Sequence, residues 1–437
     1  MSLNILRNKG FWLFDSIKGG LIRKHLDEII TIQKQPNSVE AVRLKYSYTH
    51  KLIKHANKTT TYYKKFKNAK KINDLPVVNK SLIQENFEKF KSQKFINKKT
   101  HKVSTSGSTG LSFFIFQNKN KRSRNYADSI YYYDNAAYRL GNRIYKLIVW
   151  HNNNRKSRFN SWLLNMYQFD VSNLKDQRIE YLINKLTNDN QKNKTFLCYA
   201  SALEQIAKYL EKRELFISNH GLNAIIAISE YLNKYTKETL EKHLNIPVYS
   251  RYSNEELGMI AQQSISSPTF FEVNHASYHV EILSMDSDKH VKPGEFGRIV
   301  VTDLHNYAMP MIRYDTGDIA RYKYDNNGVM QLDKIEGRKM DVIYNTSGNI
   351  ISSFITHAIF NEHYKHLKQY QLIQQGEKDY EIKLNANHST LSIEGEIINN
   401  VKSELGKDAN VKITYVEEIP PLASGKRRKV INNYIIN

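Results

Sequence analysis

Apolar side chains recur at three- and four-residue spacing through the first 75 residues, for example at Leu21, Ile22, Leu26 and Ile29. This is the spacing of one face of a helix, so the pattern predicts a helical segment over residues 1–75. A shorter pattern of the same kind follows Asn79 and predicts a helix that ends near residue 90.

From residue 103 onward, runs of apolar and aromatic residues alternate with helical patterns. Strands alternating with helices are typical of an α/β architecture. The runs that predict strands are 111–116, 144–150, 195–199, 224–229 and 247–249.

Residues 270–335 carry mostly strand signals, at 280–283, 297–302 and 319–324, with a hairpin turn at 326–328. We predict a boundary near Gly337, because shorter strands and helices follow it over about 100 residues. The expected fold class is therefore α/β. A large multi-layer N-terminal domain, residues 1–336 with a basic helical start, precedes a small mobile α+β C-terminal domain, residues 337–437.

The chain is strongly basic, with 65 Lys and Arg against 43 Asp and Glu and a net charge of +22. Residues 1–100 hold 22 basic and 7 acidic residues, so most of the excess lies in the first quarter. Such a charge can meet nucleic acid, an anionic membrane or an anionic glycan. A solvated lysine-rich surface is the alternative, and we favour it.

The single cysteine, Cys198, excludes an intramolecular disulfide and a cysteine-based zinc site. The longest apolar runs, such as 11–14 and 147–150, are far shorter than the ~20 residues that cross a bilayer. We expect a soluble, cytoplasmic protein.

A Ser/Thr/Gly loop is the densest cluster of candidate chemistry. Glycines let backbone N–H groups approach an anion closely, and hydroxyl groups add donors, so the loop can hold a polyphosphate. It is not the P-loop of classical NTPases, because no Gly-Lys-Ser/Thr follows. A flexible linker is the alternative, against which the strand-like run 111–116 argues. The loop consists of Ser104, Thr105, Ser106, Gly107, Ser108, Thr109 and Gly110.

Two further motifs combine aromatic and acidic residues. In residues 251–258, the ring of Tyr252 can stack on a purine and a carboxylate can hold Mg²⁺. In residues 313–318, Asp318 stands in a tight Asp-Thr-Gly turn and can accept hydrogen bonds from both ribose hydroxyls. An ordinary polar loop and a plain β-turn are the respective alternatives.

The last two motifs are Gly337-Arg338 with Asp341, followed by Ser347-Gly348-Asn349-Ile350, and the segment 424–430 around Lys426. Taken alone, the segment 424–430 is a basic tail. The order of the five motifs resembles that of the adenylate-forming superfamily, which includes acyl-CoA synthetases, peptide-synthetase adenylation domains and luciferases. It is most similar to phenylacetate–CoA ligase and the CapK-type proteins of polysaccharide gene clusters, over roughly residues 75–430.

The resemblance implies an ATP-dependent ligase that adenylates a carboxylate, releases pyrophosphate and transfers the acyl group. ATP and Mg²⁺ would be cofactors. Coenzyme A, or an amine or hydroxyl of a polysaccharide or lipid-linked intermediate, would be the acceptor. The carboxylate would be a small molecule or sugar-linked. Neither its identity nor the oligomeric state follows from the sequence.

The resemblance also implies roles for single residues. Lys426 would be catalytic and enter from the small domain, Glu256 would lie on Mg²⁺, and Arg338 would sit at the hinge near the ribose or phosphate. The loop 104–110 would bind the β- and γ-phosphates, and Asp318 the ribose. The remaining nucleotide-binding positions are Ser229, Glu230, Tyr252, Ser253, Asn254 and Glu255, and Gly348 would face the route of the acceptor.

Several positions depart from the family pattern. Met340 replaces an acidic hinge residue, and only Asp341 is retained. Ser253 stands where a glycine is usual, and Glu255 replaces a Ser or Thr, so the roles of Glu255 and Glu256 are open to exchange. The lysine that often follows the phosphate loop is missing, as in the phenylacetate branch.

Histidines form two groups, His275 with His279 on one predicted strand face, and His357, His363 and His366 on a predicted helix. Either group could bind a transition metal. No carboxylate or cysteine cluster accompanies them, so we interpret them as ordinary surface histidines.

The rival classes are a catalytically silent relative of the ligases and a basic membrane- or nucleic-acid-binding protein. No nucleic-acid-binding motif is recognisable, and we expect no such partner. If the basic first quarter has a partner, we expect it to be an anionic glycan or the inner face of the membrane, contacted through Lys64, Lys65, Lys67, Lys70 and Lys71.

Overall fold

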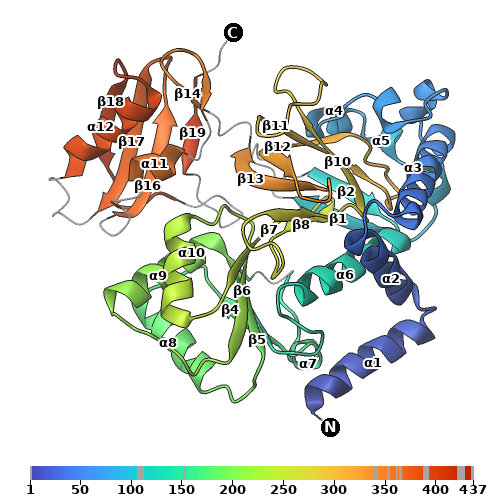
Figure 1. Cartoon of the computed structure of the whole chain (residues 1–437), viewed down its shortest axis with the longest axis horizontal. Helices are drawn as coiled ribbons and strands as arrows, with labels where there is room; N and C mark the ends of the chain where they lie inside the picture. Colours follow the sequence, from blue (N-terminus) through green and yellow to red (C-terminus); the bar gives the residue numbers. More distant parts are fainter. Residues whose placement is uncertain are drawn as a thin grey trace.

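The computed structural model describes residues 2–105, 113–150, 154–338, 343–351, 355–360, 363, 367–386, 393–420 and 429–434. Figure 1 shows helices from the N-terminal segment at one side, a large sheet flanked by helices in the centre, and a separate C-terminal sheet at the upper left. The predicted α/β class is confirmed. Among the described residues, no helix combines the length and apolar character needed to span a bilayer.

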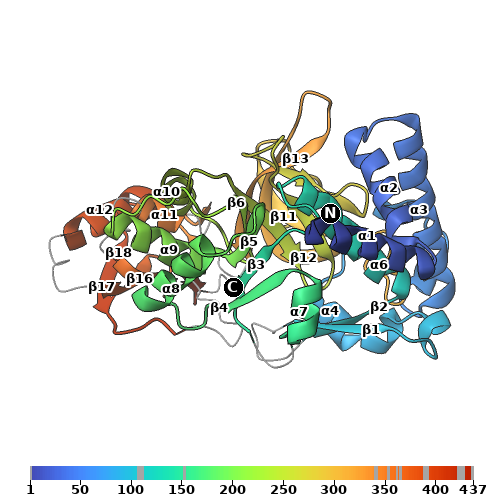
Figure 2. The same cartoon turned by 90° about the horizontal axis from the view of Figure 1, so that it is seen from below.

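Helices make up the described part of the first 95 residues, as the apolar spacing predicted. Ser38 caps α3 by accepting a hydrogen bond from the Ala41 N–H at 3.2 Å, and Asn79 caps α4 in the same way. The elements are α1 (Leu3–Ile17), α2 (Leu21–Lys34), α3 (Val39–Thr59), η1 (Tyr63–Phe66), η2 (Ile72–Asp74), α4 (Lys80–Glu85), α5 (Phe87–Phe90) and η3 (Gln93–Phe95). In Figure 2 they lie at the end of the molecule opposite the C-terminal sheet.

The parallel half of the large sheet runs in the order β4-β3-β5-β6-β7. Its inner residues and those of three helices form one apolar core, so α8, α9 and α10 cover the sheet. The elements are β3 (Ile144–Ile148), β4 (Met166–Asp170), β5 (Lys194–Tyr199), β6 (Leu222–Ile228), β7 (Val248–Asn254), α6 (Lys119–Asp134), α7 (Arg158–Leu163), α8 (Asp176–Thr187), α9 (Ala200–Lys212) and α10 (Lys234–Leu244).

The sheet continues beyond β7 with antiparallel pairing, in the order β7-β8-β9-β13-β12-β11-β10. Its core includes Leu52, Ile53 and Ala56 of α3, so the N-terminal helices pack on this half. The strands are β8 (Gly258–Gln262), β9 (Phe271–Val273), β10 (Tyr278–Leu283), β11 (Phe296–Asp303), β12 (Tyr314–Tyr324) and β13 (Met330–Arg338). β1 (His101–Thr105) and β2 (Phe113–Gln117) form a separate antiparallel pair.

The C-terminal unit, residues 343–434, has its own sheet in the order β18-β17-β16-β19 and its own apolar core. The predicted boundary after residue 336 stays a prediction. The elements are β14 (Ile343–Tyr344), β15 (Ile350–Ile351), α11 (Ile355–Phe360), β16 (Leu367–Gln374), β17 (Asp379–Ala386), α12 (Glu394–Leu405), β18 (Asn410–Tyr415) and β19 (Val430–Asn432).

Three sequence-based expectations need correction. β12 begins at Tyr314, five residues before the predicted strand, because Tyr314 and Asp315 pair with Val301 and Val300 of β11. His275 precedes β10 while His279 lies within it, so the two do not share a strand face. His363 is buried, against the expectation of a surface histidine.

Candidate active site

The candidate site lies at β7, where the large sheet changes from parallel to antiparallel pairing. The first half of β7 pairs with β6, and the second half pairs with β8. In open α/β sheets, ligands bind beyond the carboxyl ends of the parallel strands. Tyr252, Ser253 and Asn254 occupy the carboxyl end of β7.

Tyr252 and Asp318 are brought together from positions 66 residues apart. The Tyr252 hydroxyl lies 2.7 Å from Asp318 Oδ2 and 3.2 Å from Thr316 Oγ1. Burial raises the pKa of the Tyr252 phenol well above its ordinary value, and the Asp318 carboxylate raises it further. The phenol therefore stays protonated and donates to the carboxylate.

Local turn chemistry positions Asp318. Gly317 has φ +77°, a left-handed conformation that favours glycine. The Asp318 N–H donates to Thr316 Oγ1 at 3.2 Å. On the neighbouring strand, Arg338 is the direct backbone partner of Asp318, so the predicted hinge residue and the predicted ribose ligand stand opposite each other.

Glu255 and Glu256 lie in the tight turn between β7 and β8. Asn254 Oδ1 accepts the Leu257 N–H at 2.8 Å and closes this turn. Glu255 is exposed. Glu256 is half-buried, with Oε1 3.4 Å from the Tyr314 hydroxyl. The site side of the turn is therefore occupied by Glu256.

In the sequence, the predicted phosphate loop lies between β1 and β2. Ser104 and Thr105 end β1, and Phe113 begins β2 as the cross-strand partner of Thr105. The Phe113 ring stacks on the ring of Tyr314, with centroids 6.4 Å apart. The start of β2 is thereby packed next to the Tyr314–Glu256 contact. Ser106, Gly107, Ser108, Thr109 and Gly110 lie outside the described residues.

Ser229 and Glu230 follow β6 and lie level with Tyr252 of β7. Ala227 pairs with Ser250, and these two residues stand two positions before Ser229 and Tyr252. Ser229 has φ +71°, an uncommon conformation for a residue with a side chain. Glu230 Oε2 accepts the Ser201 N–H of α9 at 2.8 Å. This contact joins the end of β6 to the start of α9.

One predicted residue, Gly348, is not brought to this cluster. Gly348 is exposed in the turn between β14 and β15, where its N–H donates to Asn345 O at 2.9 Å. Lys426, Met340 and Asp341 lie outside the described residues, as does the side chain of Arg338.

Sequence reasoning missed the contact that joins the C-terminal unit to the large sheet. Lys429 Nζ lies 2.7 Å from Glu204 Oε2, and Lys208 Nζ donates to Leu367 O at 3.0 Å. Burial alone would raise the pKa of Glu204, but the Lys429 and Lys208 ammonium groups lower it to about 2. No sequence signal marked Glu204, because its partner lies 225 residues away.

Sequence reasoning also left Arg313 without a role. Its guanidinium is buried and binds Glu281 through two hydrogen bonds of 3.1 and 3.0 Å. It also donates to Leu75 O at 3.0 Å. Arg313 therefore anchors the start of β12 and does not reach the candidate site.

Parts of the chain are similar to known protein families. Residues 343–433 match the family model described as the CapK C-terminal domain. We call this unit the CapK C-terminal domain after the family model that it matches. A curated relative, the phenylacetate-coenzyme A ligase of Escherichia coli strain K12, is 25% identical over 212 residues. That match covers 45% of this chain and 48% of the relative, so the chain spans about half the length of the relative it matches.

Solved structures share the fold over almost the whole chain, CapK C-terminal domain included. A 2-hydroxyisobutyryl-CoA ligase in the postadenylation state has a TM-score of 0.71 at 16% identity, covering 91% of this chain and 90% of that one. The same ligase in the thioesterification state has a TM-score of 0.60 at 17% identity, covering 92% of each chain. The chain thus has the fold of adenylate-forming ligases, as its motifs indicated.

Proposed function

We propose that the protein is an adenylate-forming ligase that uses ATP to activate a carboxylate as an acyl adenylate. The observation that carries the proposal is the Tyr252–Asp318 contact at the carboxyl end of β7, with Glu256 next to the start of β2, which follows the Ser/Thr/Gly loop in the sequence. The shared fold and the phenylacetate–CoA ligase relative support it.

In the proposed reaction, a carboxylate oxygen attacks the α-phosphorus of ATP, an O–P bond forms, and the bond to pyrophosphate breaks. Such a reaction needs positioning and charge stabilisation more than covalent help from the protein. Lys426 would stabilise the negative charge that develops on the α-phosphoryl oxygens.

We propose that Asp318 accepts hydrogen bonds from the ribose and that Tyr252 covers the adenine, with Ser229 and Glu230 at its border. Ser253 and Asn254 complete this edge of β7. The loop 104–110 would hold the β- and γ-phosphates through N–H and hydroxyl donors, and Arg338 would bind ribose or phosphate.

Glu256 is the residue that we propose for Mg²⁺. Carboxylate oxygens are the ligands that Mg²⁺ prefers. Glu256 contacts Tyr314, which packs on the start of β2 after the predicted phosphate loop, whereas Glu255 is exposed. The ion would neutralise phosphate charge when bound. The Tyr314 hydroxyl orients the carboxylate from the protein side.

Coenzyme A is the acceptor that we propose, because the ligases with similar folds are named as CoA ligases. An amine or hydroxyl of a polysaccharide or lipid-linked intermediate is the alternative for a chain with a CapK C-terminal domain. The carboxylate would be a small molecule or a sugar-linked acid, and the compartment the cytoplasm.

The test is an ATP–pyrophosphate exchange assay with a panel of carboxylates. We expect exchange that needs both Mg²⁺ and a cognate carboxylate. Asp318→Asn should weaken ATP binding about tenfold or more, because it removes a charged acceptor. Asp333→Asn is the matched control, since Asp333 pairs with Arg321 away from the cluster.

If the wild-type protein failed to bind ATP at millimolar concentration with Mg²⁺ present, the proposed ligase function would be rejected. A silent relative or a basic binding protein would then be the better description. If exchange occurs, adding coenzyme A or a sugar amine to the preformed adenylate identifies the acceptor.

A further inference from the structure

Helix α1 is oriented opposite to an ordinary surface helix. Its polar side chains face the protein, where Asn8 Nδ2 donates to Leu140 O at 3.0 Å and Asn4 Oδ1 accepts from Asn165 Nδ2 at 3.2 Å. Asp15 is buried, and its two oxygens accept the N–H groups of Ile22 and Arg23 that begin α2. These contacts determine which face of α1 points outward.

The outward face of α1 is apolar. At 3.6 residues per turn, five of its six exposed large apolar residues fall within a stripe of about 100°, and Ile5 lies outside it. Their side chains are between 47% and 74% exposed. The stripe consists of Leu3, Leu6, Leu13, Phe14 and Ile17. A surface helix normally turns such a stripe toward the core, so this face is built to be covered by something else.

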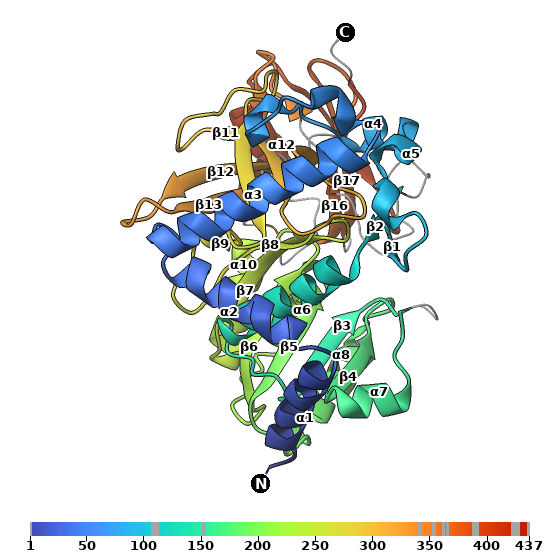
Figure 3. The same cartoon turned by 90° about the vertical axis from the view of Figure 1, so that its right-hand side faces the viewer.

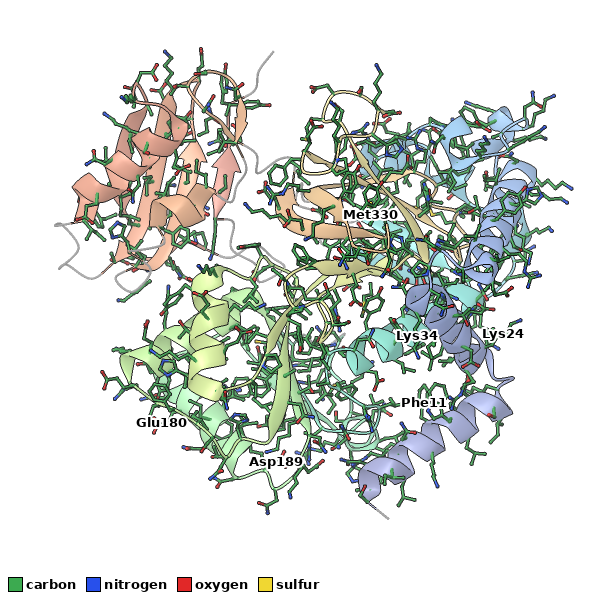
Figure 4. All side chains as sticks on the ribbon, in the orientation of Figure 1. Phe11, Lys24, Lys34, Glu180, Asp189 and Met330 are labelled. Atoms are coloured by element: carbon green, nitrogen blue, oxygen red, sulfur yellow. The ribbon has the colours of Figure 1, made fainter. Side chains whose placement is uncertain are left out.

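Helix α7 extends this apolar surface. Phe159, Trp162, Leu163 and Leu164 are all exposed on or next to it. The two helices are joined directly, because Arg7 Nη2 donates to Trp162 O at 2.9 Å. α1 and α7 lie side by side in Figures 1 and 3. In Figure 4, Phe11 marks the inward side of α1, and Lys24 stands on the neighbouring α2.

Cations surround the apolar surface, and carboxylates are nearly missing from it. Within residues 2–24 the sequence has a single acidic residue, the buried Asp15, and within residues 154–165 it has none. Lys18 lies 4.0 Å from the ring centroid of Phe14, and the Arg23 guanidinium lies 3.8 Å from that of Trp12. The surrounding cations are Arg7, Lys9, Lys18, Arg23, Lys24, Arg155, Lys156 and Arg158.

We propose that α1 and α7 together form a docking surface for a lipid bilayer that carries anionic headgroups. Apolar side chains with a rim of Lys and Arg are the features of helices that lie in the membrane interface. Aromatic residues such as Trp162 are favoured at that depth, since one end of the ring is apolar and the other polar. The basic rim attracts anionic lipids electrostatically.

Charge decides between a bilayer and a second copy of this chain. In a twofold dimer the same surface meets itself, so the cations of one copy would face those of the other. An anionic bilayer instead complements them. The five lysines around η1 are also exposed, yet the described residues there offer no comparable apolar stripe. The α1–α7 surface is therefore a better membrane contact than the lysine cluster.

The experiment is co-sedimentation of the full chain with vesicles of phosphatidylcholine containing phosphatidylglycerol, against pure phosphatidylcholine. We expect binding to the anionic vesicles and a blue shift of tryptophan fluorescence that Trp162→Phe removes. Leu13→Glu with Phe14→Glu should lower the vesicle partition coefficient by about tenfold or more, because it places two charges in the interface. Lys9→Glu with Lys18→Glu should lower it at low salt.

Matched controls use exposed residues elsewhere. Val39→Glu with Val42→Glu on α3 repeats the apolar change, and Lys64→Glu with Lys65→Glu repeats the charge change. Both controls should bind vesicles like the wild type, and circular dichroism should show all variants folded. Equal binding by Leu13→Glu with Phe14→Glu would overturn the proposal. The proposal would also be overturned if the wild type did not bind vesicles and instead self-associated in a way that these substitutions abolish.

Discussion

At the scale of single residues, the two adjacent glutamates of the β7–β8 turn have different surroundings. Glu256 lies 3.4 Å from the Tyr314 hydroxyl. Burial is the main cause that raises the pKa of the Tyr314 phenol, and the Glu256 carboxylate raises it further. Glu255 is exposed. The two side chains thus provide an internal comparison for the metal assignment.

We predict that Glu256→Gln lowers pyrophosphate exchange by ~10²-fold, because an amide is a weaker ligand for Mg²⁺ than a carboxylate. Glu255→Gln is the matched control and should stay within about twofold of the wild type. Exchange rates are measured against Mg²⁺ concentration, and Glu256→Gln should need more of the ion. A larger loss in Glu255→Gln than in Glu256→Gln would exchange the two roles.

For Lys426, we predict that Lys426→Ala lowers adenylation by ~10²–10³-fold, since it removes a positioned charge from the α-phosphoryl transition state. Acyl transfer from a preformed adenylate should lose much less. The two half-reactions are measured separately. Equal losses in both would show a structural role, and no loss in either would show that the segment 424–430 is only a basic tail.

At the scale of elements, α6 shows how a polar helix can be buried. Lys121 and Asp303 are both buried and lie 2.8 Å apart. One turn later, Arg124 donates to Glu28 of α2 at 3.0 Å and to Ala276 O at 2.7 Å. These bonds connect α6 to the N-terminal helices on one side and to the sheet on the other.

We predict that Asp303→Asn lowers the free energy of unfolding by about 3–5 kcal/mol, because the Lys121 ammonium stays buried without a negative partner. Urea denaturation followed by circular dichroism measures this change. Glu88→Gln is the control, since Glu88 forms an exposed pair with Lys91 and should cost below ~1 kcal/mol. Similar values for both variants would contradict the assignment.

At the scale of the whole molecule, the placement of the CapK C-terminal domain depends on few polar contacts. Lys429 reaches Glu204 of α9 from β19's start, and Lys208 reaches the backbone of Leu367. Glu204 is thus placed to hold this domain against α9.

We predict that Glu204→Gln shifts the population of this arrangement by about tenfold, because a buried ion pair loses its negative partner. Small-angle X-ray scattering should show a larger radius of gyration, and adenylation should slow. Glu238→Gln, which breaks an exposed pair with Lys234 on α10, is the control. An unchanged radius in Glu204→Gln would show that apolar contacts alone hold the domain.

The pH dependence has a definite sign. The docked pKa of Glu204 is about 2, below the ordinary 4.5, so the ion pair favours docking at every pH above about 4.5. The contribution is lost as the pH falls from about 4.5 toward 2. The wild-type radius should therefore stay constant from pH 8 to pH 5 and rise at lower pH. Glu204→Gln should lack this transition.

The sequence by itself determined the order of the elements and the identity of the motifs. Helical spacing predicted the helices before residue 90, and the apolar runs predicted β5, β6 and β11, because these patterns depend on neighbours along the chain. The strand predicted from residue 319 missed the start of β12. Asp315 and Thr316 are polar and carry no apolar strand pattern, and pairing with β11 is what makes this segment a strand.

Only the tertiary structure decided which residues meet. Tyr252 and Asp318 form a contact because β7 and β12 belong to one sheet, and Glu204 and Lys429 form one because the C-terminal domain packs on α9. The same holds for α1, whose apolar stripe is visible in the sequence while its outward direction is not. Spacing along a chain identifies a helix face, but the contacts of Asn4, Asn8 and Asp15 decide where that face points.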